Sequence, residues 1–87
     1  MQTKYIVFED PTKEPYMFMF ADTLEHMRVN AVFVTNTMWP FKAVSAGFVN
    51  TGTGDCYGES ISMKLKSNTK RDTILAKRIL GIPKDYA

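Results

Sequence analysis

The sequence predicts a single α+β domain, in which a four-stranded antiparallel sheet made of two hairpins packs against two helices. Two observations support this prediction. Runs rich in β-branched and aromatic residues occur in pairs around a turn, in residues 3–20 and again in residues 41–65. A stretch with helical spacing of apolar residues follows each pair. Because 87 residues suffice for one domain, we expect residues 1–87 to fold as one unit in the order ββαββα.

The first hairpin is predicted in residues 3–20. Residues 3–9 (TKYIVFE) and 16–20 have strand composition, and the segment between them contains Asp10 and two prolines, which favour a turn. The simplest pairing places one apolar set on each side of the hairpin: Ile6, Phe8, Met17 and Met19 on one side, and Tyr5, Val7, Phe18 and Phe20 on the other. A sheet that is apolar on both sides must be covered on both.

A chain this short offers two helices at most, so another copy of the protein can supply the second cover. This predicts a homo-oligomer, and the alternative is a sheet covered by the protein's own helix and loops. The candidate interface residues are Tyr5, Val7, Met17, Phe18, Met19 and Trp39.

The first helix is predicted from about Thr23 to Asn30. Asp22 and Glu25 have the spacing of a capping box, with Asp22 as the N-cap. The following segment, 31–38, contains several β-branched residues, so the pattern leaves it open between helix and extended chain.

The second hairpin is predicted around a loop at residues 51–54 (TGTG). The simplest register pairs Phe48 with Tyr57 and Ala46 with Glu59 on one face. The other face pairs small residues, Gly47 with Gly58 and Ser45 with Ser60, and is therefore nearly bare. Glycine inside a strand marks close approach by something else or a bulge. We considered a tightly packed helix, a bulge that changes the register, and a ligand or partner chain, for which the candidate residues are Ser45, Gly47, Gly58, Glu59 and Ser60.

For the second helix, Ser67, Asn68 and Thr69 are all N-cap candidates, and Thr69 with Asp72 would complete a capping box. The helix is predicted to end at Gly81 and Pro83. Residues 64–87 hold seven basic and two acidic side chains, against four basic and seven acidic in residues 1–63. This asymmetry indicates a solvated helix face or a surface for an acidic partner. The candidate nucleic-acid-binding residues are Lys70, Arg71, Lys77 and Arg78.

Few residues are available for catalysis or metal binding. One cysteine, Cys56, excludes an internal disulfide, and one histidine, His26, leaves little for a metal site. No phosphate-binding glycine motif occurs, and no apolar run has the length of a membrane span. We therefore expect no enzyme activity, no catalytic residue, no cofactor, no metal and no membrane partner, and the absence of a signal-peptide pattern predicts an intracellular protein.

Four short motifs carry a resemblance: YIVF at residues 5–8, VSAGFV at 44–49, CYGES at 56–60 and LKS at 65–67. On these motifs the sequence resembles a group of short, uncharacterised proteins encoded by phages and prophages. The resemblance implies a viral or prophage origin, and with it the cytoplasm of a host cell.

These observations give three functional hypotheses. The first is a non-enzymatic phage-type interaction protein that associates with itself and binds a host or defence-system protein. The second is a binding protein for a small ligand such as a nucleotide, using the bare face of the second hairpin. The third is nucleic-acid binding through the basic C-terminal helix.

Overall fold

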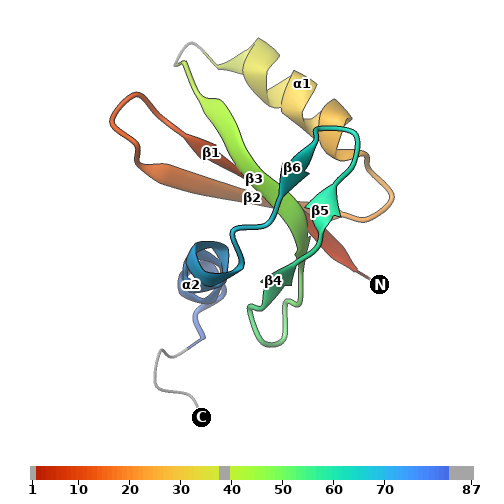
Figure 1. Cartoon of the computed structure of the whole chain (residues 1–87), viewed down its shortest axis with the longest axis vertical. Helices are drawn as coiled ribbons and strands as arrows, with labels where there is room; N and C mark the ends of the chain where they lie inside the picture. Colours follow the sequence, from red (N-terminus) through yellow and green to blue (C-terminus); the bar gives the residue numbers. More distant parts are fainter. Residues whose placement is uncertain (1, 38–39, 83–87) are drawn as a thin grey trace.

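The computed structural model describes residues 2–37 and 40–82. Within them the elements are β1 (Thr3–Glu9), β2 (Pro15–Ala21), α1 (His26–Asn36), β3 (Lys42–Val49), β4 (Cys56–Tyr57), β5 (Glu59–Ser60), β6 (Leu65–Lys66) and α2 (Thr69–Leu80). The predicted α+β class is confirmed: an antiparallel four-stranded sheet in the order β2-β1-β3-β4 packs with two helices (Figure 1). The difference is a small second sheet, β5-β6, which the sequence did not predict.

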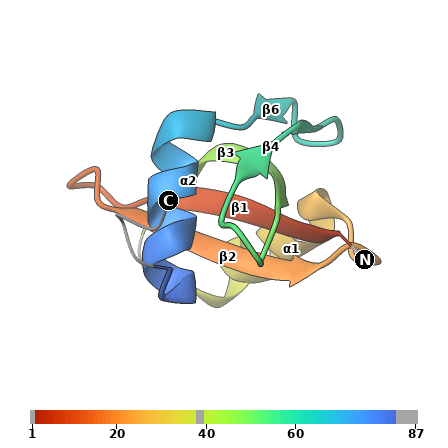
Figure 2. The same cartoon turned by 90° about the horizontal axis from the view of Figure 1, so that it is seen from below.

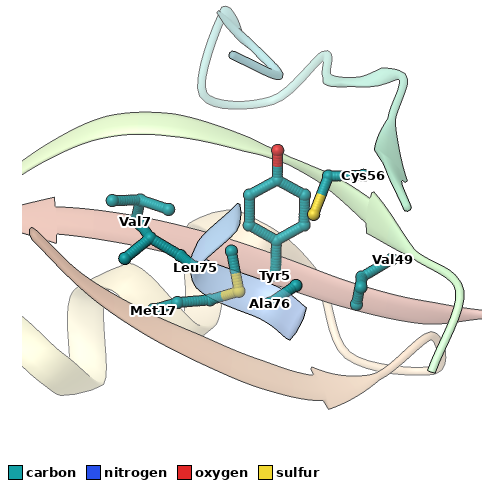
Figure 3. Close-up of a cluster of buried hydrophobic side chains, with 7 residues drawn as sticks. All are labelled: Tyr5, Val7, Met17, Val49, Cys56, Leu75 and Ala76. Atoms are coloured by element: carbon teal, nitrogen blue, oxygen red, sulfur yellow. The ribbon is translucent and has the colours of Figure 1, made fainter. Parts of the chain in front are cut away.

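The two helices cover opposite faces of the sheet, as Figure 2 shows. On one face, α2 packs over a cluster of buried side chains formed by Tyr5, Val7, Met17, Val49, Cys56, Leu75 and Ala76 (Figure 3). On the other face, α1 packs over Ile6, Phe8 and Ala46, with Val29 and Phe33 as its own contribution. The protein therefore covers both faces of its sheet without a second copy.

The register of the first hairpin differs from the predicted one by one residue. Tyr5 pairs with Met19 and Val7 with Met17, so these four share the α2 face. The reason is a five-residue loop, in which Asp10 Oδ1 accepts hydrogen bonds from the Thr12 and Glu14 backbone N–H groups at 2.8 and 3.0 Å. The α1 face of the hairpin consequently carries four aromatic or apolar residues: Ile6, Phe8, Phe18 and Phe20.

The second hairpin forms only next to its loop. The predicted pair Phe48–Tyr57 is confirmed, and Asn50 N–H donates to Asp55 O at 2.9 Å. The predicted pairs further from the loop, Ala46 with Glu59 and Ser45 with Ser60, are wrong.

The chain leaves the sheet at Gly58, whose φ of +77° is a conformation that favours glycine. Glu59 and Ser60 pair instead with Lys66 and Leu65 in the small second sheet.

The first helix begins later than predicted, at His26. In α1 the N-cap is Glu25, without a side-chain hydrogen bond, so the predicted capping box with Asp22 as N-cap is wrong. A turn in which Leu24 N–H donates to Ala21 O takes its place. The helix then continues through the β-branched segment to Asn36.

Of the three N-cap candidates for α2, Asn68 is the one used, and its side chain accepts from Arg71 N, so the capping box with Thr69 as N-cap does not form. The predicted stop at Gly81 is confirmed by its left-handed backbone and by the hydrogen bond from Ile82 N–H to Lys77 O at 2.9 Å. Pro83, the other predicted stop residue, lies outside the described residues.

Candidate functional site

An apolar groove lies between α1 and β2. It has a volume of about 430 Å³ and is lined by Phe18, Leu24, Arg28, Val29, Val32 and Phe33; we refer to it as the α1–β2 groove. Its walls are exposed: 64% of Val32, 46% of Leu24 and 42% of Phe18 are accessible to solvent. Helical spacing places Arg28 and Val32 on neighbouring turns of α1, so they flank the groove together.

Aromatic contacts fix the floor of the α1–β2 groove. The Phe33 ring stacks on Phe8 at a centroid distance of 3.9 Å and meets Phe18 edge-on at 4.6 Å. Phe8 is fully buried, so it anchors the two partly exposed rings to the core. The aromatic base of the groove is therefore built from residues of β1, β2 and α1 that pack on one another.

The groove adjoins an open edge of the sheet. β2 is the terminal strand of the sheet order, and among the described residues no strand pairs with its outer side. The opposite terminal strand, β4, has only two residues, and Cys56 N–H donates to Thr73 Oγ1 in α2 at 3.0 Å. Only the β2 end of the sheet thus offers a long strand for pairing.

A second, more polar pocket surrounds His26. It measures about 460 Å³ and is lined by Lys4, Glu25, His26, Phe48 and the segment Gly58–Ser62. The His26 Nε2 atom lies 2.9 Å from Gly47 O. A carbonyl oxygen only accepts, so Nε2 carries the proton and Nδ1 keeps its lone pair.

The imidazole of His26 is held in its neutral form. Only 5% of the residue is exposed, and burial lowers its pKa; the hydrogen bond with Gly47 acts in the opposite direction, and the charge of Lys4 lowers the pKa further. Lys4 itself donates from Nζ to Leu24 O at 2.8 Å. We refer to this site as the His26 pocket.

The structure divides the five predicted ligand-binding residues among three places. Gly58, Glu59 and Ser60 line the His26 pocket. Gly47 is buried, and a Cβ added to it would clash with Ser67 Oγ and Tyr57 O. The predicted helix does pack on this face, because Val49 and Cys56 lie in the cluster under α2. At Gly47 itself, the close neighbours are Ser67 and the backbone of Tyr57.

Ser45 lies elsewhere, in a buried polar network that holds α2 on the sheet. Its Oγ accepts from Arg71 Nη2 at 3.0 Å, and Arg71 also bonds Glu9 through Nη1 at 3.1 Å. The fully buried Asp72 accepts from Tyr5 Oη at 2.6 Å and from Asn68 N at 3.0 Å. Every described member has its partners, so we assign this network to stability.

The predicted basic surface on α2 is smaller in the structure than in the sequence. Arg71 is engaged by Glu9, Asp72 and Ser45 and does not present a free charge. Lys77 is half-buried, with its side chain packed over Gly54. Of the predicted nucleic-acid-binding residues, Lys70 and Arg78 remain exposed.

The predicted interface residues also differ in how accessible they are. Tyr5, Val7 and Met17 lie in the core under α2, so they are not available to another chain and we withdraw them from the interface. Met19 is half-buried, and Phe18 is the member with a large exposed fraction. Trp39 lies outside the described residues.

The nucleophile-type residues do not come together. His26 lies among Phe20 and Phe48 on the α1 side, whereas Cys56 belongs to the core cluster under α2 on the other face of the sheet. Burial raises the pKa of the Cys56 thiol to about 12, with a further increase from the charge of Asp72. Among the described residues, no group of three or more His, Cys, Asp or Glu side chains is placed to hold a metal ion.

Comparison with known proteins does not assign the chain to a family. No protein-family model, no curated protein and no solved structure matches the chain. No helix within the described parts of the chain combines the length and the apolar character needed to cross a membrane. Inferences about function therefore depend on the groove, the pocket and the open edge.

Proposed function

We propose that this protein is a non-enzymatic interaction protein that associates with itself and binds other proteins through the α1–β2 groove. One observation carries the proposal. The protein's own helices cover both faces of the sheet, and the α1–β2 groove still exposes Phe18, Leu24 and Val32 side by side. Contiguous exposed apolar surface on a small domain marks an interaction site.

The groove favours an apolar segment of a partner protein. Its aromatic floor and aliphatic walls match the anchor residues of a helix or an extended peptide. Arg28, the one charged residue of the lining, can hydrogen-bond a carboxylate or a carbonyl oxygen at the rim. On the resemblance to phage and prophage proteins, we propose that the partner is a host or defence-system protein and that the interaction takes place in the cytoplasm of the host cell.

The experiment compares two exposed aliphatic residues. Val32→Asp places a charge in the groove, whereas Ile61→Asp changes a residue that is 84% exposed and lies outside the groove. We expect Val32→Asp to abolish both self-association in light scattering and capture of a partner from host lysate, and Ile61→Asp to retain both. Unchanged association and capture by Val32→Asp, with the fold intact by circular dichroism, would contradict the proposal.

A second candidate is a small-ligand site in the His26 pocket. It is favoured by the buried neutral histidine, whose Nδ1 can accept a hydrogen bond, beside Lys4 and the Ser60–Ser62 segment. A thermal-shift screen of nucleosides and nucleotides tests it, since a bound ligand raises the melting temperature. Nucleosides should act more strongly than nucleotides, because Glu25 and Glu59 repel phosphate. No shift across the panel would reject this candidate.

A further inference from the structure

We propose that two copies of this chain pair through the outer edges of β2, antiparallel to each other, with a two-fold axis at Phe18. The two sheets would then join into one continuous sheet, with four strands from each copy. The inference rests on the self-association in the proposed function and names its geometry.

The direction of the free backbone groups follows from the first hairpin. Asp10 N–H donates to Glu14 O at 3.1 Å, which makes this a hydrogen-bonded pair. Such pairs alternate along an antiparallel ladder, so Tyr16, Phe18 and Phe20 direct their backbone groups toward β1. Met17 and Met19 lie between them. Their N–H and C=O groups consequently point away from β1, in the plane of the sheet, toward the open edge.

These outward groups match a second copy of the same strand. With the axis at Phe18, Met17 lies opposite Met19 of the other copy, and their N–H and C=O groups bond one another in both directions. Pro15, which lacks an N–H, lies opposite Ala21, and its C=O accepts from Ala21. The two-fold register therefore uses the outward groups of Met17 and Met19 fully. The Pro15–Ala21 pair makes one bond instead of two, and the Ala21 C=O that receives no donor from Pro15 accepts from Leu24 N–H within its own chain.

The side chains are also self-complementary. On the α1 face, Phe18 meets Phe18 across the axis and Tyr16 meets Phe20, which are favourable cross-strand pairs. All seven residues of β2 are uncharged, so no like charges face each other within the paired strands. Just outside the paired strands, Glu14 of one copy faces Asp22 of the other. The positive charge of Lys13 lies next to Glu14 in the sequence and offsets this pair of negative charges.

Within the described residues, the edge of β2 has neither a bulge nor a charged side chain to protect it. Natural edge strands carry inward charges, bulges or internal prolines that prevent pairing with another chain. β2 pairs with β1 over seven consecutive residues without a bulge, and its proline is its first residue. An unprotected strand of this length is a pairing surface.

The α1–β2 groove completes the contact. Seven residues at about 3.4 Å each form an edge of roughly 24 Å, which is a narrow strip compared with the ~800 Å² per partner of a stable interface. α1 lies beside β2 at this border of the sheet (Figure 2). Val32 of α1 and Leu24 of the preceding turn are exposed, so they would contact the second copy and add the apolar area that the strand lacks.

A cysteine placed on the axis tests the register. Phe18 opposite Phe18 is a non-hydrogen-bonded pair with a Cα separation of about 4.5 Å, which a disulfide can span. Tyr16 has the same exposure, 42%, but its two copies would lie about 14 Å apart along the strands. We expect Phe18→Cys to form a covalent dimer under mild oxidation and Tyr16→Cys to remain monomeric on a non-reducing gel, in a Cys56→Ala background.

A charge on the axis tests the contact without oxidation. Phe18→Lys places two cations next to each other, so we expect its dimer dissociation constant to rise at least tenfold in analytical ultracentrifugation. A parent protein that stays monomeric at millimolar concentration overturns both this inference and the proposed self-association. A parent dimer that survives Phe18→Lys, or a folded Phe18→Cys that does not cross-link, overturns only the β2 register.

Discussion

The hydroxyl of Tyr5 donates a 2.6 Å hydrogen bond to Oδ2 of Asp72, a residue 67 positions further along the chain. Both residues are fully buried. Burial, followed by the hydrogen bond to Asp72, raises the pKa of Tyr5, so the phenol stays protonated and remains a donor throughout the physiological range. This bond joins the central strand of the sheet to the first turn of α2.

Removal of the Tyr5 hydroxyl should destabilise the protein. Tyr5→Phe leaves the buried carboxylate of Asp72 without one of its donors, at a cost of about 1–3 kcal/mol in the free energy of unfolding. Urea denaturation measures this cost. Tyr57→Phe is the matched control, because Tyr57 is 42% exposed and its hydroxyl accepts only a 3.3 Å bond from Gln2. Equal stability of the two variants would refute the role of the buried bond.

Gly47→Ala should be among the most damaging single-methyl changes in the protein. The added Cβ would clash with Ser67 Oγ and with the backbone oxygen of Tyr57, and the backbone cannot yield without breaking the β3–β4 pairing. We expect a loss of about 1–3 kcal/mol, the usual cost of overpacking. Gly52→Ala in the exposed loop has only the Asn50 side chain nearby, at 3.2 Å, and should change the free energy of unfolding by less than about 0.5 kcal/mol.

The stability of the protein should fall as the pH drops below about 6.5, the pKa of an unperturbed histidine. His26 is neutral in the folded state because burial lowers its pKa, whereas in the unfolded chain it takes up a proton below that pH. The unfolded state then binds more protons, and the free energy of unfolding decreases by at most about 1.4 kcal/mol per pH unit.

The variant His26→Gln isolates this effect. Its amide nitrogen can still donate to Gly47 O, but the side chain does not titrate. Denaturation midpoints measured between pH 7.5 and 5.5 should therefore change less in the variant than in the parent protein. Identical slopes would show that the histidine does not govern this part of the pH profile.

Cys56 should resist alkylation in the folded protein. The side chain is 1% exposed, and its pKa of about 12 leaves on the order of 10³-fold less thiolate at pH 8 than in an ordinary cysteine. Iodoacetamide labelling followed by mass spectrometry should be slow without denaturant and rapid in urea. Fast labelling under native conditions would mean that α2 opens readily from the β4 end of the sheet.

Local sequence patterns predicted which segments form strands and helices. They did not predict the full register in which the strands pair or the residue at which each helix begins. The strands at residues 3–9, the first pairs of the second hairpin and the Gly81 stop of α2 are all specified by neighbouring residues. The register of β2 is not specified by neighbouring residues, because it depends on the length of the loop that begins at Asp10. A loop one residue longer or shorter would turn the side chains of β2 to the other face of the sheet. Similarly, Asn68 and Thr69 are both good N-caps, and tertiary contacts of Asp72 decide between them.

The candidate sites depend on contacts between distant segments. The sequence indicated Gly58, Glu59 and Ser60, but the His26 pocket also needs Lys4 from β1 and His26 from α1. Arg71 looked like part of a basic surface because nothing in its neighbourhood shows that Glu9 and Ser45 will face it. The exposed Phe18 was indicated by its apolar surroundings, but its position at an open edge required the strand order.

The strand order also has a consequence during synthesis. β1 is made before the other strands of its sheet and lies between β2 and β3, and the hydroxyl of its Tyr5 bonds a residue of α2. A nascent chain can form the first hairpin early, but it cannot complete this domain until the residues of α2 have left the ribosome. Folding should therefore be a late, all-or-none event dominated by contacts that are distant in sequence.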